Sequence, residues 1–180
     1  MNVLILHGIL GSAGENWGQW LCDELITRSY NVTMPSLPNS DHPDRQEWYT
    51  VIANLMAELG SDTIIVAHSL GVTSSLDFLE TAAQPIKGLV SVSGFSDDYG
   101  YKLNSYFLKE KNVDFEKVNK NLGKAFAFFG DNDPYVTQEA LHNLADALKV
   151  KPVIIPNGGH LNAAAGFNQF PQLLDAVLSV

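Results

Sequence analysis

The sequence predicts an α/β fold in which a six-stranded, mostly parallel sheet carries helices on both faces. Short apolar runs rich in β-branched residues alternate along the chain with longer segments of helical period. Such alternation is typical of parallel strands joined by crossover helices. The chain has 180 residues, enough for one domain with a sizeable core. We therefore expect residues 1–180 to form a single domain.

Strand and helix signals follow one another along the whole chain. The expected strands are 3–6, 31–34, 63–67, 88–92, 125–129 and 153–155. The expected helices are 15–29, 44–59, 70–80, 136–148 and 171–178. Pro35 ends the second strand, and Pro171 stands at the first position of the last helix, where proline is tolerated. No linker, internal repeat or low-complexity segment divides the chain.

Residues 96–124 interrupt the alternation. The segment lies between the fourth and fifth strands and has no clear apolar period, yet it carries several aromatic side chains. Insertions of this length in compact domains are usually functional or mobile. Two interpretations stay open: a small lid over a site, or one or two surface helices that pack through their aromatic residues.

The charge balance restricts the partners. Eleven Lys and Arg against twenty Asp and Glu give a formal net charge of −9. Nucleic acids and anionic membranes are bound by clustered basic residues, so we expect neither as a partner. No apolar run approaches the length of a membrane span, and residues 1–6 lack the basic region of a signal peptide. The single cysteine, Cys22, is expected to be a buried structural thiol in a soluble, cytoplasmic protein.

A serine stands where the third strand meets its helix. The sequence Ala67-His68-Ser69-Leu70-Gly71 joins these elements with almost no loop, which would place Ser69 on a tight turn at the carboxyl edge of the sheet. Small residues two positions to either side let strand and helix approach closely. The Leu70 N–H would lie at the helix N-terminus and could donate to an oxyanion. Serine is also a common helix N-cap, and the pentapeptide alone fits both roles about equally.

Glycines follow the first strand. In His7-Gly8-Ile9-Leu10-Gly11 they allow a sharp turn that aims a backbone N–H at a pocket, and we assign that N–H to Ile9, with Leu10 as the alternative. His7 stands at the strand end and is expected to be structural, not catalytic. The spacing G-x-x-G-x-x-G differs from the G-x-G-x-x-G of dinucleotide sites, and no acidic residue ends the second strand. Both differences argue against a dinucleotide cofactor.

Two further loops supply an acid and a base. Asp131 and Asp133 follow the fifth strand, where a carboxylate can orient a histidine, although both also fit a turn and Asp133 fits a helix cap. His160 follows Gly158-Gly159 just after the last strand. The chain order Ser, Asp, His is that of α/β hydrolases. Each signal is weak alone, but their agreement in order and in placement at strand ends predicts a Ser–His–Asp triad.

The sequence offers no support for a metal or phosphate site. The histidines and aspartates show neither His-x-x-x-His nor Cys-x-x-Cys spacing, and no glycine-rich loop ends in Gly-Lys-Ser or Gly-Lys-Thr. We therefore expect no metal and no cofactor.

Taken together, the motifs resemble a family of small serine hydrolases that includes the human retinoblastoma-binding serine hydrolase and compact bacterial relatives. The matching pieces are His7-Gly8, Trp17-x-x-Trp20, Met34-Pro35, His68-Ser69-x-Gly71, Gly130-x-x-Asp133-Pro134 and Gly158-Gly159-His160, which span nearly the whole chain. The resemblance implies a three-layer α/β-hydrolase fold with a minimal sheet and no large cap domain. It implies Ser69, Asp133 and His160 as the triad, because the acid of the family directly precedes proline. Asp97 and Asp98 are the minor alternative for the acid.

The expected reaction is hydrolysis of a small-molecule ester through an acyl-enzyme. The residues expected to line the substrate site are Leu10, Phe95, Tyr135 and Leu161. Their side chains suggest an apolar acyl group, although ordinary packing at the sheet edge fits them equally. The expected lack of a large cap favours short esters over long lipids. The alternative is a protein-binding module with an idle triad, because fold does not determine function.

Overall fold

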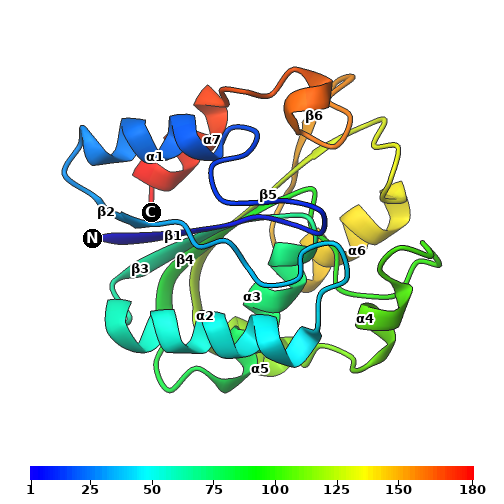
Figure 1. The fold of residues 1–180 in the computed structure, drawn as a ribbon, viewed down its shortest axis with the longest axis horizontal. Coiled ribbons are helices and arrows are strands. Elements are labelled where there is room, and N and C mark those ends of the chain that lie inside the picture. The colour runs from blue at the N-terminus through cyan, green and yellow to red at the C-terminus, as the bar shows by residue number, and fades with distance from the viewer.

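The computed structural model describes residues 1–180 and contains one six-stranded sheet with helices on both faces (Figure 1). The strands are β1 (Asn2–Leu6), β2 (Asn31–Thr33), β3 (Thr63–His68), β4 (Ile86–Val92), β5 (Leu122–Gly130) and β6 (Val153–Ile155). They lie in the order β2-β1-β3-β4-β5-β6, and every neighbouring pair is parallel. The predicted α/β fold is thereby confirmed, with no large cap domain on the sheet.

Seven α-helices connect and follow the strands. They are α1 (Gly18–Ile26), α2 (Arg45–Leu59), α3 (Leu70–Thr81), α4 (Ser105–Lys109), α5 (Phe115–Lys120), α6 (Gln138–Ala147) and α7 (Pro171–Leu178). A 3-10 turn covers Ala163–Ala165. The first helix begins later than predicted, because residues 13–17 form turns and Trp17 becomes the N-cap of α1. No helix has the length and apolar character needed to cross a bilayer.

The pleat of the strands divides the core into two parts. Successive side chains of a strand point to opposite faces, so Val3 of β1 packs on one side and Leu4 on the other. The smaller core, of 17 buried residues, lies beneath α1 and α7 and contains Cys22. The larger core, of 24 buried residues, lies between the opposite face of the sheet and the remaining helices (Figure 1). The larger core therefore also has to accommodate the insertion.

Residues 96–124 contain two short helices, α4 and α5, and the first residues of β5. Phe107, Leu108 and Val118 are buried in the larger core. The two helices therefore pack on the core, as the second sequence interpretation expects, but through aliphatic side chains as well as the aromatic Phe107. Residues 97–104 precede α4 and contain no helix or strand. A lid movement of the insertion stays a prediction.

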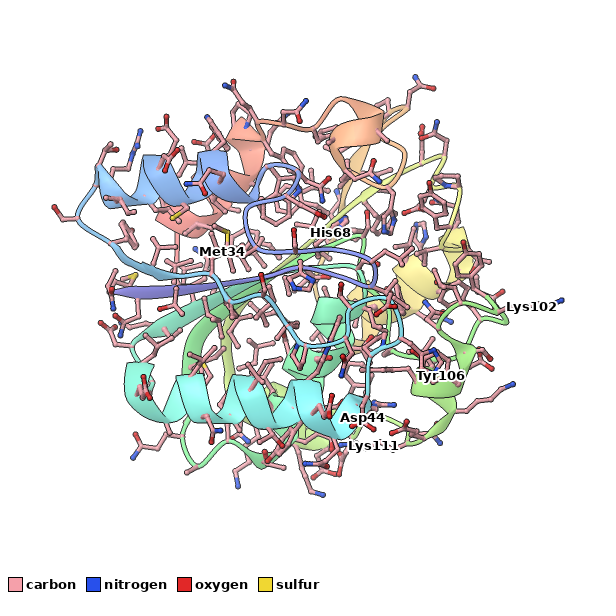
Figure 2. All side chains as sticks on the ribbon, viewed as in Figure 1. Met34, Asp44, His68, Lys102, Tyr106 and Lys111 are labelled. Atoms are coloured by element: carbon pink, nitrogen blue, oxygen red, sulfur yellow. The ribbon has the colours of Figure 1, made fainter.

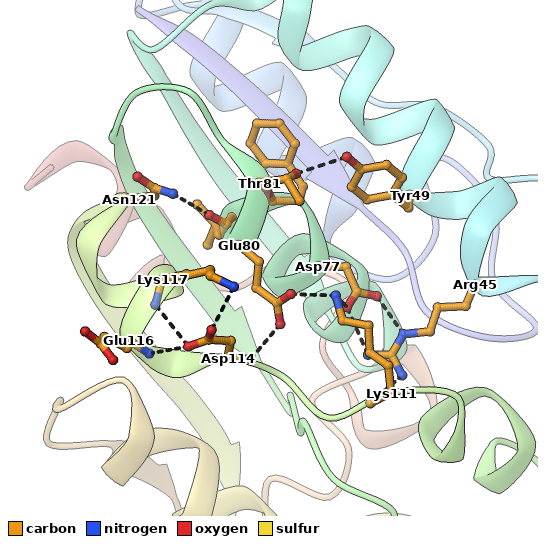
Figure 3. A network of polar contacts seen from close by, with 12 residues as sticks. Arg45, Tyr49, Asp77, Glu80, Thr81, Lys111, Asp114, Glu116, Lys117 and Asn121 are labelled. Carbon is orange, nitrogen blue, oxygen red and sulfur yellow. Dashed lines mark hydrogen bonds and ion pairs between the residues drawn. The ribbon is translucent and has the colours of Figure 1, made fainter.

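A buried ion pair fixes α4 to the body of the molecule (Figure 3). Arg45 of α2 donates to both carboxylate oxygens of Asp77 in α3, at 2.7 and 2.9 Å, and each side chain is 4% exposed. The same guanidinium donates to Phe107 O and Lys111 O at 2.9 and 3.0 Å. The Lys111 ammonium in turn contacts Asp77 and Glu80 at 3.2 and 2.6 Å. The insertion is therefore anchored at the C-terminal end of α4.

Candidate active site

Ser69 lies between β3 and α3, at the carboxyl edge of the sheet. Its φ of 54° and ψ of −125° are a strained conformation for a residue with a side chain. The hydroxyl makes no capping hydrogen bond, although Ser69 occupies the N-cap position of α3. Two glycines make the turn possible: a Cβ added to Gly8 would lie 2.8 Å from Ser69 Cβ, and one added to Gly71 would lie 2.4 Å from His7 O. The turn thus presents Ser69 to a pocket and not to the first N–H groups of the helix.

Asp133 and His160 meet at the ends of β5 and β6. His160 Nδ1 lies 2.7 Å from Asp133 Oδ2, and the Asp133 side chain is fully buried. The other carboxylate oxygen, Oδ1, accepts the N–H groups of Tyr135 and Val136 at 2.9 and 3.1 Å, which prevents the carboxylate from rotating. A carboxylate can only accept, so Nδ1 carries the proton and Nε2 is left as an acceptor. Asp133 therefore forms a turn and also orients the imidazole.

The two residues before this acid hold the histidine loop through its backbone. Asp131 Oδ1 accepts the Asn157 N–H, and Asn132 Oδ1 accepts the Gly159 N–H, each at 2.7 Å. Through these two bonds, consecutive residues of the loop after β5 hold the backbone of the loop after β6. Asp131, the alternative acid, is thus engaged with backbone and not with His160.

His68, labelled in Figure 2, ends β3, the strand that precedes Ser69. Its side chain holds the same loop. Its Nε2 lies 2.9 Å from His160 O, and a carbonyl can only accept, so Nε2 carries the proton. Burial, and the charge of His160 when it is protonated, lower the pKa of His68 to about 3, which keeps the ring neutral. Trp17 packs edge-on against His68 at 6.1 Å and donates from Nε1 to Leu161 O at 3.0 Å. The sequence motifs gave no positioning role to His68, although a histidine that ends an apolar, β-branched strand is a detectable signal.

Among the N–H groups beside Ser69, those of Ile9 and Leu70 donate to no group of the protein. The Leu10 N–H, by contrast, donates to Ser40 O at 2.6 Å, so it is not free for a ligand. Leu70 begins α3, where the helix dipole adds positive potential. Both N–H groups that the sequence assigned first to an oxyanion are therefore free to bind a ligand.

A pocket of about 270 Å³ connects these groups. Its lining consists of His7, Gly8, Ile9, Leu10, Gly11, Glu15, Asn16, His68, Ser69, Tyr99, Tyr101, Leu103, Asn104, Tyr135, Val136, His160 and Asn162. No lysine or arginine is among them, and the insertion contributes four residues, from Tyr99 to Asn104. The pocket is therefore bounded by strand-end loops on one side and by the insertion on the other.

Tyrosine rings line the insertion side. Tyr99 and Tyr101 stack at 6.3 Å, and Tyr101 contacts Tyr135 at 6.4 Å. The ring of Tyr135 lies edge-on to His160 at 5.2 Å. Asn104 Nδ2 donates to the Tyr99 hydroxyl at 3.0 Å. Burial raises the pKa of Tyr99 to about 12, so its phenol stays protonated.

Known proteins match this chain over nearly all of its length. The model of the serine hydrolase family covers residues 3–179. The chain belongs to the serine hydrolase family. The family that the sequence motifs resemble is thereby confirmed.

Individual relatives of this serine hydrolase agree with that assignment. The hydrolase YdeN of Bacillus subtilis is 25% identical over 179 residues, which are 98% of this chain and 94% of YdeN. The serine hydrolase RBBP9 of Rattus norvegicus is 26% identical over 121 residues, 66% of this chain and 61% of RBBP9. The solved structure of the B. subtilis ydeN gene product has a TM-score of 0.92 at 24% identity and covers 99% of this chain and 97% of its own. A carboxylesterase of Nitrososphaera gargenis has a TM-score of 0.70 at 9% identity, over 99% and 88%, which shows a shared fold.

Of the four substrate-binding residues predicted for this serine hydrolase, two line the pocket and two do not. Leu10 and Tyr135 line the pocket and are 62% and 44% exposed. Phe95 and Leu161 do not line it, and for them the prediction is wrong: Phe95 is buried in the larger core and Leu161 in the smaller one. Both follow strands at the correct edge, but the loop conformation turns each side chain inward. No sequence signal placed Tyr99 at the pocket, because the insertion has no regular period.

Proposed function

We propose that this serine hydrolase is a carboxylesterase-like enzyme that cleaves small ester-type substrates through Ser69, His160 and Asp133. One observation carries the proposal. The His160 imidazole makes a 2.7 Å contact with a fully buried carboxylate, in the pocket that Ser69 also lines. The fold shared with a carboxylesterase supports the ester as the bond that is cleaved.

In the proposed mechanism, His160 Nε2 takes the hydroxyl proton of Ser69 as its oxygen attacks the ester carbonyl. The carbonyl electron pair moves to the oxygen, which then accepts the free N–H groups of Ile9 and Leu70. Collapse of this intermediate expels the alcohol, which receives the proton from His160 and leaves an acyl ester on the serine. Water, deprotonated by His160, then releases the acid. Asp133 holds the imidazole in the Nδ1–H tautomer throughout.

The pocket favours short, uncharged acyl groups. Its volume of about 270 Å³ is at the small end for ligand sites. Glu15 is a carboxylate in the lining, and no lysine or arginine is present to pair with an anionic substrate. We therefore expect p-nitrophenyl butyrate to be cleaved faster than p-nitrophenyl palmitate and faster than a hemisuccinate ester.

A fluorophosphonate probe tests the nucleophile directly. The probe should label the wild type and should leave Ser69→Ala unlabelled, because only an activated serine reacts with it. Rapid mixing with p-nitrophenyl acetate should give a burst of p-nitrophenol equal to the labelled sites. Equal labelling of both proteins would refute Ser69 as nucleophile. A folded wild type with neither labelling nor burst would instead support the binding-module alternative.

A further inference from the structure

We infer that His7 is a positioning residue that clamps the Gly8–Ile9 peptide so that the Ile9 N–H faces the reacting carbonyl oxygen. His7 lies outside the triad and touches no reacting atom in the proposed mechanism. The inference rests on the proposed function, because an oxyanion site has meaning only for an acyl-transfer enzyme. It extends that function by naming the side chain that maintains the site.

Backbone groups fix the His7 ring on both sides. The Leu37 N–H donates to His7 Nε2 at 2.8 Å, so that nitrogen carries no proton. The proton is therefore on Nδ1, which donates to Gly8 O at 2.8 Å. The ring is 8% exposed and packs edge-on against Trp48 at 5.7 Å. Burial also lowers the pKa of His7, which favours this neutral form.

The clamped oxygen controls the direction of the proposed oxyanion donor. Gly8 O and the Ile9 N–H belong to one planar trans peptide and point in opposite directions. His7 Nδ1 and the Gly11 N–H, the latter at 3.2 Å, both hold that oxygen. The Ile9 N–H therefore points away from both donors and has no partner in the protein.

The same peptide lies next to the proposed nucleophile. A Cβ added to Gly8 would lie 3.2 Å from Ser69 Oγ, so the peptide is within one atomic layer of the reacting centre. Of the two donors to Gly8 O, His7 is the closer. It is also a side chain, so a substitution can remove it, whereas the Gly11 donor is a backbone N–H. Loss of His7 should therefore let the peptide tilt without destroying the loop.

Three substitutions separate the two contacts of the ring. His7→Leu removes both. His7→Asn places an amide near the Nδ1 position and keeps a donor for Gly8 O. His7→Gln places the amide near the Nε2 position and keeps only an acceptor for the Leu37 N–H. The matched control is His142→Leu: His142 Nδ1 also contacts a backbone carbonyl at 2.8 Å, that of Gln138, but on α6 and outside the pocket.

The readouts are kcat and KM for p-nitrophenyl butyrate per site titrated with fluorophosphonate, and the inhibition constant of a trifluoromethyl ketone. Its tetrahedral adduct carries the oxyanion that the site would bind. Removing a whole oxyanion donor costs about 10²–10³ in kcat, so His7→Leu, which misdirects one, should lower kcat by about 10–100-fold. The same substitution should raise the inhibition constant of the ketone by the same factor and leave KM nearly unchanged. His7→Asn should recover most of the rate, His7→Gln should not, and the control should match the wild type.

The inference is overturned if kcat per titrated site in His7→Leu stays within about twofold of the wild type, far short of a lost oxyanion donor. It is also overturned if His7→Gln restores the rate and His7→Asn does not. Should His7→Leu fail to fold, the comparison of the two amide variants decides alone. A wild type that the fluorophosphonate does not label refutes the proposed function instead, a result distinct from any difference among the His7 variants.

Discussion

The two walls of the pocket are held in different ways. On the wall formed by strand-end loops, short hydrogen bonds tie side chains to backbone, as His68 does with His160 O and Asn132 with the Gly159 N–H. The insertion wall meets the pocket through tyrosine rings and is anchored from behind by Arg45 and Asp77. The first wall therefore fixes the direction of reactive atoms, whereas the second sets the space left for a substrate. Substitutions in the first should act mainly on kcat, and substitutions in the second mainly on stability and KM.

The largest expected effect is on the strand-end wall. Asp133→Asn should lower kcat by about 10⁴, because an amide no longer holds the imidazole in the Nδ1–H tautomer. Asp131→Asn is the matched control, since it retains an oxygen that can accept the Asn157 N–H. Its kcat should stay within about tenfold of the wild type, as the loop contact is weakened and not lost. Steady-state kinetics on both variants checks this, and equal losses would move the orienting acid away from Asp133.

The next effect is on stability, at the anchor of the insertion wall. Arg45→Met leaves the Asp77 carboxylate buried without its partner, which should cost about 3–5 kcal/mol of the free energy of unfolding in urea. Because Asp77 keeps only the Lys111 contact, α4 loses its fixed end and KM should rise more than kcat falls. Arg28→Met is the control: its exposed pair with Glu24 should contribute less than about 1 kcal/mol. Similar losses in both variants would contradict the anchoring role.

Acid stability tests the neutral state of His68. Its pKa is about 3 in the folded protein against 6.5 for the free side chain, so between these pH values the unfolded chain binds more protons. Stability should therefore fall as the pH is lowered from 6.5 toward 3. His68→Gln has no titrating group and can still donate to His160 O. Its melting temperature should fall less steeply than that of the wild type between pH 6.5 and 4, and parallel curves would show that His68 does not contribute.

The smallest effect concerns the tyrosine rings of the insertion wall. Tyr101→Ala removes contacts to Tyr99 and Tyr135, each worth about 0.5–1.5 kcal/mol as an aromatic pair. We expect KM for an aryl ester to rise a few-fold with kcat nearly unchanged. Tyr101→Phe keeps the ring and should behave as the wild type. A selective loss of kcat in Tyr101→Ala would place this wall in the reaction and erase the contrast between the two walls.

Local patterns were sufficient for much of the fold and for the polar loops of the site. Period and length located all six strands and the longer helices, because each signal depends on neighbours along the chain. Ser69, Asp133 and His160 could be placed near one another, since the carboxyl ends of parallel strands share one edge of the sheet. The sequence left Asp131 as a second possible acid. The structure places it on the Asn157 N–H instead of the imidazole.

The substrate side of the pocket was beyond such patterns. Phe95 and Leu161 stand at the correct strand ends yet point into the two cores, because loop dihedrals and long-range packing decide where a side chain turns after its strand. The insertion wall depends on Arg45 and Asp77, 32 residues apart, and His68 meets His160 across 92 residues. The sequence by itself determined a mostly parallel six-stranded sheet, the succession of strands and helices along the chain, and the residue types at the sheet edge. Only the tertiary structure decided which of those residues share a pocket, because that depends on contacts between segments far apart in the chain.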